Sequence, residues 1–298
     1  MKTILYATDC TKKDACSLKY AYRFSSILKA ELHILHVYDF PSTYHSTIQP
    51  LEPLKKRMHK ERIELVEKYC AKHLQNEFYH KTITTHVVEN NSISESISRL
   101  SKILSPDLII IGMKDNHSNR GYFSGNIADS LLGKIEVPLL IVPNDMTYKV
   151  ISTIVYATDF EQEDILSIQK LIEIASPFEA LIEIVHVYEM DKYIARENME
   201  KFKNTLLKQV SYPEITFRNI VSSKTKSGLL SVLNNEKASM LAMLERKHNW
   251  GLNNLFHKDL VKDMEANVEI PILAFNKHST KIKLQNANAY NTKNVLAY

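Results

Sequence analysis

A polar segment in the first half of the chain has the composition of an anion-binding loop. It follows the apolar run 107–112 and reads GMKDNHSNRGYFSGNIADSLL over residues 112–132. Glycine lets a backbone approach phosphate oxygens closely, and a helix N-terminus offers free N–H groups and a positive dipole end. We expect a helix to start near Gly125 and Asn126, followed by Ile127. The segment therefore predicts a cradle for a negatively charged ligand.

Further candidate site residues follow two other apolar runs. Ala7, Thr8 and Asp9 end the run at the N-terminus, and Val37 ends the second run. In open α/β sheets a ligand lies beyond the carboxyl ends of the strands, where the strand order reverses. We expect these residues to meet the loop after Gly112 at that edge. Asp9 has two interpretations, because an Asp in this position either contacts a ligand or ends a strand and caps the next helix.

Short apolar runs alternate with longer amphipathic segments, a pattern typical of βαβ units and a parallel sheet. Their content of Ile, Leu and Val fits strands covered by helices on both faces. Thr11 or Asp14 can cap the first helix, and Ser92 with Glu95 forms a capping box. The predicted strands are 3–8, 32–38, 83–88, 107–112 and 138–142, and the predicted helices are 13–29, 53–78, 92–104 and 125–134.

The second half of the chain repeats the first. TILYATD at 3–9 returns as TIVYATD at 153–159, an offset of 159 − 9 = 150, and EVPLLIV at 136–142 returns as EIPILAF at 269–275. We therefore predict a domain over 1–145, a second over 150–277 and a polar tail over 278–298. The second set of strands is 152–157, 181–187, 214–220, 239–244 and 270–275, with helices at 162–175, 190–209, 225–235 and 254–265.

Composition gives a globular chain and few clues to partners. Hydrophobic residues make up 44% of the 298 residues, the formal charge is +4 and the sequence pI is about 8.7. This mild charge does not argue for nucleic acid. Three cysteines without a CxxC pair fit a reducing cytoplasm, and the sequence predicts neither a signal peptide nor a membrane span.

The opening strand that ends in Asp9, the HVYD at 36–39 and the glycine-bearing loop before VPLLIVP resemble the universal stress protein family over about 1–144 and 150–276. The resemblance implies two tandem α/β domains, each a five-stranded parallel sheet of the Rossmann-like, adenine nucleotide alpha hydrolase-like kind. It also implies a pseudo-two-fold arrangement in which the two halves pack through their last strands, as single-domain relatives do in homodimers. The segment RKHNWGLNNLFHKDL resembles the second half of tandem stress proteins of Bacteroidetes-type bacteria.

Many members of that family bind ATP, with its associated Mg, through a loop of the form G-x2-G-x9-G-(S/T). Here the loop reads Gly112-x2-Asp115-x9-Gly125-Asn126, so two of four positions differ. A carboxylate at Asp115 that points into the site repels triphosphate. In the second half, Glu245 stands where Gly112 stands and Lys258-Asp259 where Gly125-Asn126 stand. The glycine cradle is lost, so we expect no ATP there.

These observations leave three hypotheses. The first is a cytoplasmic stress-response module whose first domain binds an adenine nucleotide weakly. In it, Ala7, Thr8, Asp9 and Val37 hold base and ribose, and Gly112, Gly125, Asn126 and Ile127 face the phosphates. The second is a protein-interaction scaffold that has lost the ligand. The third is a slow ATP hydrolase; no GxSxG or Walker motif supports an enzyme.

Two other groups of residues have simpler interpretations. His36 and His186 occupy matching positions inside apolar strands, which favours buried, hydrogen-bonded histidines over metal ligands. No HExxH or His-plus-Cys spacing predicts a metal site. Cys10 lies beside the predicted site, but the sequence gives no reason for a lowered thiol pKa.

Overall fold

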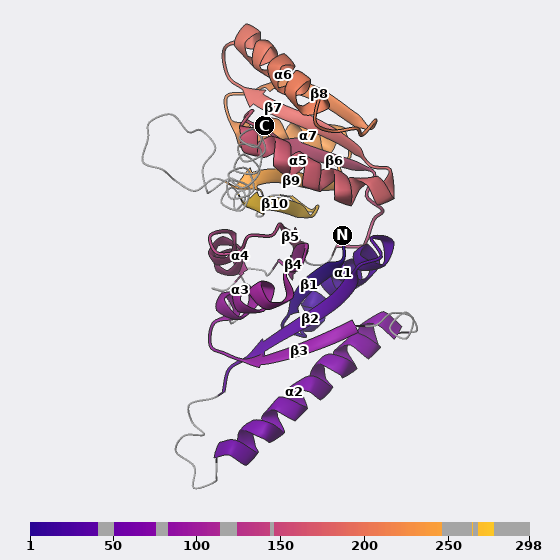
Figure 1. The fold of residues 1–298 in the computed structure, drawn as a ribbon, viewed down its shortest axis with the longest axis vertical. Coiled ribbons are helices and arrows are strands. Elements are labelled where there is room, and N and C mark those ends of the chain that lie inside the picture. Colours follow the sequence, from indigo (N-terminus) through magenta and orange to yellow (C-terminus); the bar gives the residue numbers. More distant parts are fainter. Residues whose placement is uncertain are drawn as a thin grey trace, which may run out of the picture. The chain divides into compact units, whose positions relative to one another are not determined.

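The computed structural model describes residues 1–40, 51–75, 83–113, 124–143, 146–245, 264 and 268–276, with 124–126 as backbone alone. The chain forms two compact units, 1–134 with 139–148, and 135–138 with 149–298. Figure 1 shows the elements of both units along the sequence. Each unit is described by itself.

The first unit contains one five-stranded parallel sheet in the order β3-β2-β1-β4-β5. The chain moves from β1 through β2 to β3 in one direction and then crosses back to β4 and β5, so right-handed crossovers place α1 and α2 on one face of the sheet and α3 and α4 on the other. Accordingly, α1 packs against α2, and α3 packs against α4. The strands are β1 (Thr3–Thr8), β2 (Glu31–Tyr38), β3 (Ile83–Glu89), β4 (Leu108–Gly112) and β5 (Leu139–Val142); the helices are α1 (Ala15–Ile27), α2 (Leu51–Leu74), α3 (Ile93–Leu104) and α4 (Ser124–Leu132), with a 3-10 turn, η1, at Lys12–Asp14.

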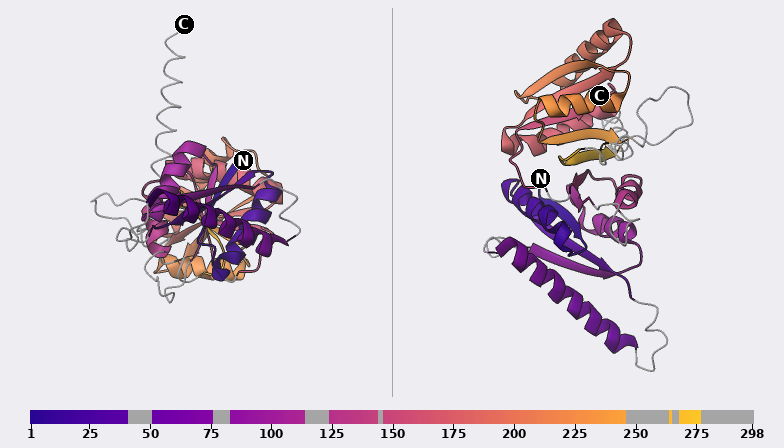
Figure 2. Two further views of the ribbon diagram at one scale, coloured as in Figure 1. Left: turned by 90° about the horizontal axis from the view of Figure 1, so that it is seen from below. Right: turned by 180° about the vertical axis from the view of Figure 1, so that it is seen from behind.

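The second unit repeats this topology, with strand order β10-β9-β6-β7-β8. Figure 2 shows the ribbon from two further sides. The strands are β6 (Thr153–Ala157), β7 (Leu181–Tyr188), β8 (Ile215–Val221), β9 (Met240–Glu245) and β10 (Ile272–Asn276); the helices are α5 (Gln162–Ala175), α6 (Lys192–Leu207) and α7 (Thr225–Asn235), with a 3-10 turn, η4, at Ser176–Phe178.

The central strands are covered on both faces. Ile4, Leu5 and Tyr6 are fully buried in β1, and their counterparts in β6, Ile154, Val155 and Tyr156, are buried equally. Consecutive buried residues leave no solvent-facing side, as expected for a parallel sheet with helices on both faces. The predicted α/β class is confirmed.

Most predicted elements appear with ends shifted by one or two residues, while α2 ends four residues early. The predicted helix 254–265 and the tail 278–298 lie outside the described residues, apart from Met264. Ser92 caps α3, since its side chain accepts a hydrogen bond from the Glu95 N–H. Among the described residues, no helix is long and apolar enough to cross a membrane.

One pair of cross-strand positions carries different chemistry in the two units. In the first, the His33 Nδ1 atom on β2 lies 2.9 Å from the His86 Nε2 atom on β3. The strand registers place Glu183 and Arg218 at the same positions in the second unit, where Nε and Oε1 are 2.8 Å apart. Burial and the neighbouring His33 lower the pKa of His86. Burial raises the pKa of Glu183, and Arg218 opposes that rise.

Candidate functional site

A small cavity lies at the carboxyl ends of the first sheet, where the strand order reverses between β1 and β4. Its volume is about 50 Å³. The walls come from β1, β2, β4 and the starts of α3 and α4, and most of them are apolar. The lining residues are Ala7, Thr8, Asp9, Asp14, Leu35, Val37, Ile93, Ile97, Ile111, Gly112 and Ile127.

Six of the nine residues that the sequence assigned to a site line this cavity together: Ala7, Thr8, Asp9, Val37, Gly112 and Ile127. The structure describes no side chain for the other three residues. Gly125 and Asn126 lie in the first turn of α4, described as backbone only, and Asp115 lies outside the described residues.

Asp14 is a cavity residue that sequence reasoning assigned to a different task. It stands at the N-cap position of α1, but its side chain makes no cap hydrogen bond. Its Oδ2 atom instead accepts a hydrogen bond from the Thr8 hydroxyl at 2.5 Å, and Asp14 is 6% exposed. The expected cap is therefore wrong, because the buried Thr8 hydroxyl takes the carboxylate. The spacing of Thr8 and Asp14, repeated at Thr158 and Asp164, was the available signal.

Gly112 is required by the position of that carboxylate. A Cβ atom at residue 112 would lie 2.3 Å from the Asp14 Oδ1 atom and 2.7 Å from the Ser17 Oγ atom. Side-chain atoms do not approach so closely, so only a residue without a Cβ lets β4 end beneath Asp14. This need for glycine is steric and independent of any phosphate.

The turn after β1 fixes Asp9 at the edge of the cavity. The Asp9 Oδ1 atom accepts a hydrogen bond from the Thr11 N–H at 2.9 Å, which is an Asx-turn. Cys10 follows with φ of 59°, in the left-handed region, and its N–H donates to the Thr8 hydroxyl. Asp9 therefore shapes the turn after β1 and lines the cavity, while its contact with a ligand stays a prediction.

His36 on β2 and its counterpart His186 on β7 hold the end of the neighbouring strand in the same way in both units. The His36 Nδ1 atom lies 3.1 Å from the Thr8 carbonyl oxygen, and His186 makes the same contact with Thr158 at 3.0 Å. This confirms hydrogen-bonded strand histidines. Burial raises the pKa of the nearby Cys10 thiol to about 12, so this thiol stays protonated at neutral pH.

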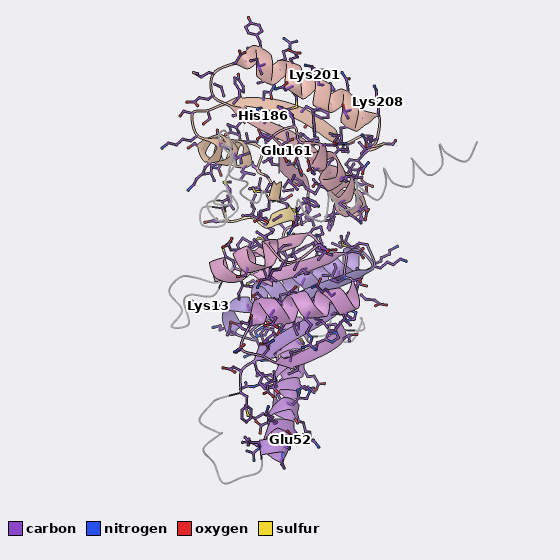
Figure 3. The ribbon with its side chains drawn as sticks, turned by 60° about the vertical axis from the view of Figure 1, so that its left-hand side comes forward. Lys13, Glu52, Glu161, His186, Lys201 and Lys208 are labelled. Carbon is purple, nitrogen blue, oxygen red and sulfur yellow. The ribbon has the colours of Figure 1, made fainter. Side chains whose placement is uncertain are left out.

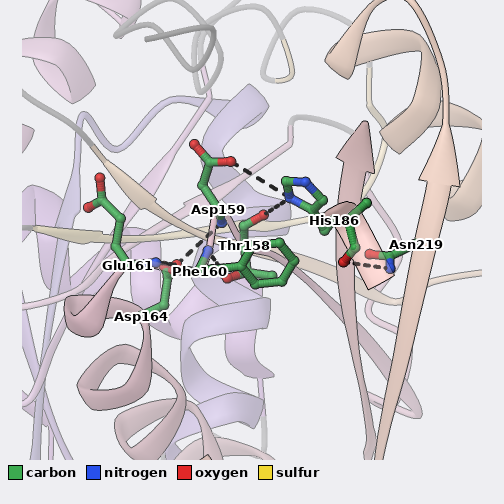
Figure 4. Close-up of polar contacts among 8 residues, drawn as sticks. Thr158, Asp159, Phe160, Glu161, Asp164, His186 and Asn219 are labelled. Carbon is green, nitrogen blue, oxygen red and sulfur yellow. Dashed lines mark hydrogen bonds and ion pairs between the residues drawn. The ribbon is translucent and has the colours of Figure 1, made fainter. Parts of the chain in front are cut away.

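In the second unit, the counterpart of Asp14 is Asp164, and hydrogen-bond donors of the protein surround its carboxylate. Figure 4 shows Asp164 together with Thr158, Asp159 and Glu161. Its carboxylate accepts hydrogen bonds from the hydroxyls of Tyr156 and Thr158 at 2.7 and 2.8 Å. The N–H groups of Asp159 and Glu161 also donate to it, at 3.3 and 3.1 Å. A carboxylate with four such donors holds the turn after β6 in place.

The strand register corrects one sequence assignment. Ala7 pairs with Ile111 in the first unit, and the equivalent Ala157 pairs with Met243 in the second, so Leu244 rather than Glu245 stands at the Gly112 position. The match of 136–142 to 269–275 implies an offset of 269 − 136 = 133, which fails at this position. The reason is that Leu244 and its partner Phe275 are 275 − 244 = 31 residues apart, whereas Gly112 and its partner Val142 are 142 − 112 = 30 residues apart. Leu244, 7% exposed, puts a bulky side chain where the first unit has none.

Charge in the first cavity is negative. Among the described lining residues, Asp9 and Asp14 are the ionisable ones and none carries a positive charge. No group of three or more His, Cys, Asp or Glu able to hold a metal occurs within the described part of the chain. Such a lining favours ribose hydroxyls or an amino group beside the carboxylates and disfavours phosphate there.

Comparisons with known proteins agree with this architecture. Residues 1–143 match the model of the Universal stress protein family. No curated protein matches the chain significantly. A universal stress protein from Archaeoglobus fulgidus is 16% identical with a TM-score of 0.64, covering 92% of this chain and 96% of that one. A putative universal stress protein from Pseudomonas aeruginosa is 13% identical with a TM-score of 0.62, covering 95% and 97%. A cytoplasmic domain of a prokaryotic cation chloride cotransporter is 11% identical with a TM-score of 0.55, covering 94% and 96%.

The fold and the cavity define a tandem α/β protein of Rossmann-like architecture. Residues 1–143 match the Universal stress protein family model, and the chain as a whole shares its fold with solved universal stress proteins.

Proposed function

We propose that the first unit binds an adenine nucleotide through its nucleoside end, as part of a cytoplasmic stress-response module. The observation that carries this proposal is the cavity at the reversal of strand order, lined by six residues that the sequence had singled out. A mostly apolar cavity with a few polar groups is the usual form of a small-molecule site.

The chemistry of the lining supports the base and ribose as the bound part. Leu35, Val37 and Ile111 offer apolar contact for a flat ring, while the Asp9 carboxylate can accept hydrogen bonds from hydroxyl or amino groups. The phosphates would then extend toward the start of α4, whose backbone N–H groups suit an anion.

The small volume predicts weak binding. About 50 Å³ is far below the roughly 300–1,000 Å³ of typical ligand pockets, so a nucleoside must displace side chains to enter. A dissociation constant near the millimolar range, about −4 kcal/mol, is therefore expected.

Calorimetric titration of the full chain with ATP, adenosine and tripolyphosphate tests this proposal. Val37→Phe adds four carbon atoms inside the cavity and should abolish binding of ATP and adenosine. Val221→Phe makes the same substitution at a 68% exposed position in the second unit and should leave binding unchanged. Tripolyphosphate should give no heat. Absence of saturable heat from wild type with both ATP and adenosine would overturn the proposal.

Asp115→Gly provides a separate test of the sequence comparison. If the Asp115 carboxylate repels the phosphates, this substitution should tighten ATP and leave adenosine unaffected. Equal changes for both ligands would contradict that electrostatic interpretation.

A second candidate function is a scaffold without a nucleotide. It is favoured by the second unit, where Leu244 fills the Gly112 position and four donors satisfy Asp164. The same titration separates the two functions, because the scaffold gives no heat with any nucleotide. Pairing of the halves through their last strands and homodimer formation stay predictions, as does slow ATP hydrolysis.

A further inference from the structure

A groove in the second unit lies between α6 and β8, the strand at the edge of that sheet. Its volume is about 620 Å³, within the range of small-molecule sites. Arg196, Met199 and Lys203 line it from α6, at spacings that place them on one face of the helix. Phe217 and Asn219 line it from β8, two residues apart and so on one face of the strand.

The groove combines an apolar floor with positive charge. Met199 is 5% exposed, and the ring of Phe217 lies beneath the Lys203 ammonium, which is 5.6 Å from the ring centroid. Neither Arg196 nor Lys203 forms an ion pair with another residue of the described chain. Glu200 also lines the groove from α6, so the charged side chains of the groove are two cations and one carboxylate, a net charge of 2 − 1 = +1, and neither cation is ion-paired within the described chain.

Asn219 supplies a hydrogen-bond acceptor that the protein does not use. Its Nδ2 atom donates to the Ala195 carbonyl oxygen at 3.1 Å, which fixes the orientation of the amide (Figure 4). Its Oδ1 atom is buried and has no hydrogen-bond partner. A buried acceptor without a partner destabilises the protein, so a ligand that donates a hydrogen bond at this point supplies the missing interaction.

The first unit does not repeat this arrangement. Strand register places Val87 at the Asn219 position and Thr85 at the Phe217 position. Val87 packs against a cluster of apolar side chains, so no acceptor is left there. That cluster is Tyr38, Phe40, Leu54 and Met58. The acceptor and the aromatic floor are therefore particular to the second unit.

We propose that the groove between α6 and β8 binds a small amphipathic anion with an aromatic body and an N–H or O–H donor. The aromatic body rests on Phe217 and Met199, the anionic group lies beside Lys203 or Arg196, and the donor reaches Asn219 Oδ1. From Arg196 to Leu207 the groove follows roughly 16 Å of helix, enough for two fused or linked rings. This site is independent of the nucleotide cavity in the first unit.

The probe is 1-anilinonaphthalene-8-sulfonate, which carries linked aromatic rings, one sulfonate and one N–H. Fluorescence titration of the full chain gives its dissociation constant. Lys203→Glu should weaken binding at least fivefold. Lys201→Glu is the matched control, since Lys201 lies on the same helix, pairs with Glu197 and does not line the groove (Figure 3). It should change binding less than twofold, and high salt should weaken binding to wild type more than to Lys203→Glu.

Two further arms test the ligand class. The N-methyl derivative of the probe lacks the donor and should bind wild type at least threefold more weakly. Dodecanoate, an anion without ring or donor, should displace the probe poorly. Equal effects of Lys203→Glu and Lys201→Glu would overturn the site. Equal affinity of the methylated probe, or displacement by dodecanoate at lower concentration than the probe's own constant, would overturn the class of ligand.

Discussion

Replacing Gly112 by Ala tests whether a carboxylate, rather than a phosphate, requires glycine at this position. The new Cβ atom would lie 2.3 Å from the Asp14 Oδ1 atom, about 1 Å closer than a normal contact. Asp14 cannot move freely, because its other oxygen is hydrogen-bonded to the buried Thr8 hydroxyl. The strain must therefore shift β4, break that hydrogen bond or both.

The expected loss in the free energy of unfolding has two contributions, steric overpacking and the broken hydrogen bond. Overpacking of a filled interior costs about 1–3 kcal/mol. Loss of a hydrogen bond to a buried carboxylate adds roughly 1.5–3 kcal/mol when it breaks fully. Because strain relieved by one term reduces the other, we expect a loss of about 2–4 kcal/mol in the free energy of unfolding of the first unit.

Urea unfolding followed by hydrogen exchange measures this loss in the full chain, with protection at β1 and β4 reporting the first unit and at β6 and β9 the second. Only the first set should lose protection. Asp14→Ala in the same chain removes the obstructing carboxylate, so the double variant should cost at least 1 kcal/mol less than the sum of the single changes. A cost below about 0.5 kcal/mol for Gly112→Ala, or strict additivity with Asp14→Ala, would refute the steric reasoning.

Three other outcomes are expected. The pKa of His86 is lower in the folded state than in the unfolded state, so the folded first unit binds fewer protons. Its stability is therefore fully present above about pH 6.5 and falls as the pH drops below that value. Urea midpoints measured at pH 7.5 and 5.5 should show this loss in wild type and less of it in the double variant His33→Glu/His86→Arg. Arg218→Met should destabilise the second unit by about 2–3 kcal/mol, because it leaves the buried Glu183 carboxylate without its partner; the partial exposure of Arg218 limits the loss. Adding Glu183→Gln should restore part of the urea midpoint. No restoration would mean that the lost packing of the Arg218 aliphatic chain causes the destabilisation. The Cys10 thiol, with a pKa of about 12, should react with iodoacetamide at pH 8 far more slowly than free cysteine, and mass spectrometry showing rapid labelling would contradict burial as the cause.

The internal repeat and the periodicity of apolar residues predicted the duplicated α/β fold. Strands with consecutive Ile, Leu and Val have one stable environment, a parallel sheet covered on both faces, so local composition decides them. In open α/β sheets, ligands bind at the carboxyl ends of the strands where the strand order reverses, and this rule predicted which strand ends meet. Six candidate residues therefore line one cavity.

The tertiary structure alone decided which polar groups satisfy one another. Asp14 stands where a helix cap is expected, yet a hydroxyl six residues earlier takes its carboxylate, because that hydroxyl is buried and has to be paired. Sequence placed Glu245 at the Gly112 position, and only the hydrogen-bond register between strands moved the equivalence to Leu244. Side-chain pairing across strands and register depend on contacts between distant segments, which local propensity does not encode. The groove beside Asn219 has the same origin, because it exists only where α6 and β8 come together.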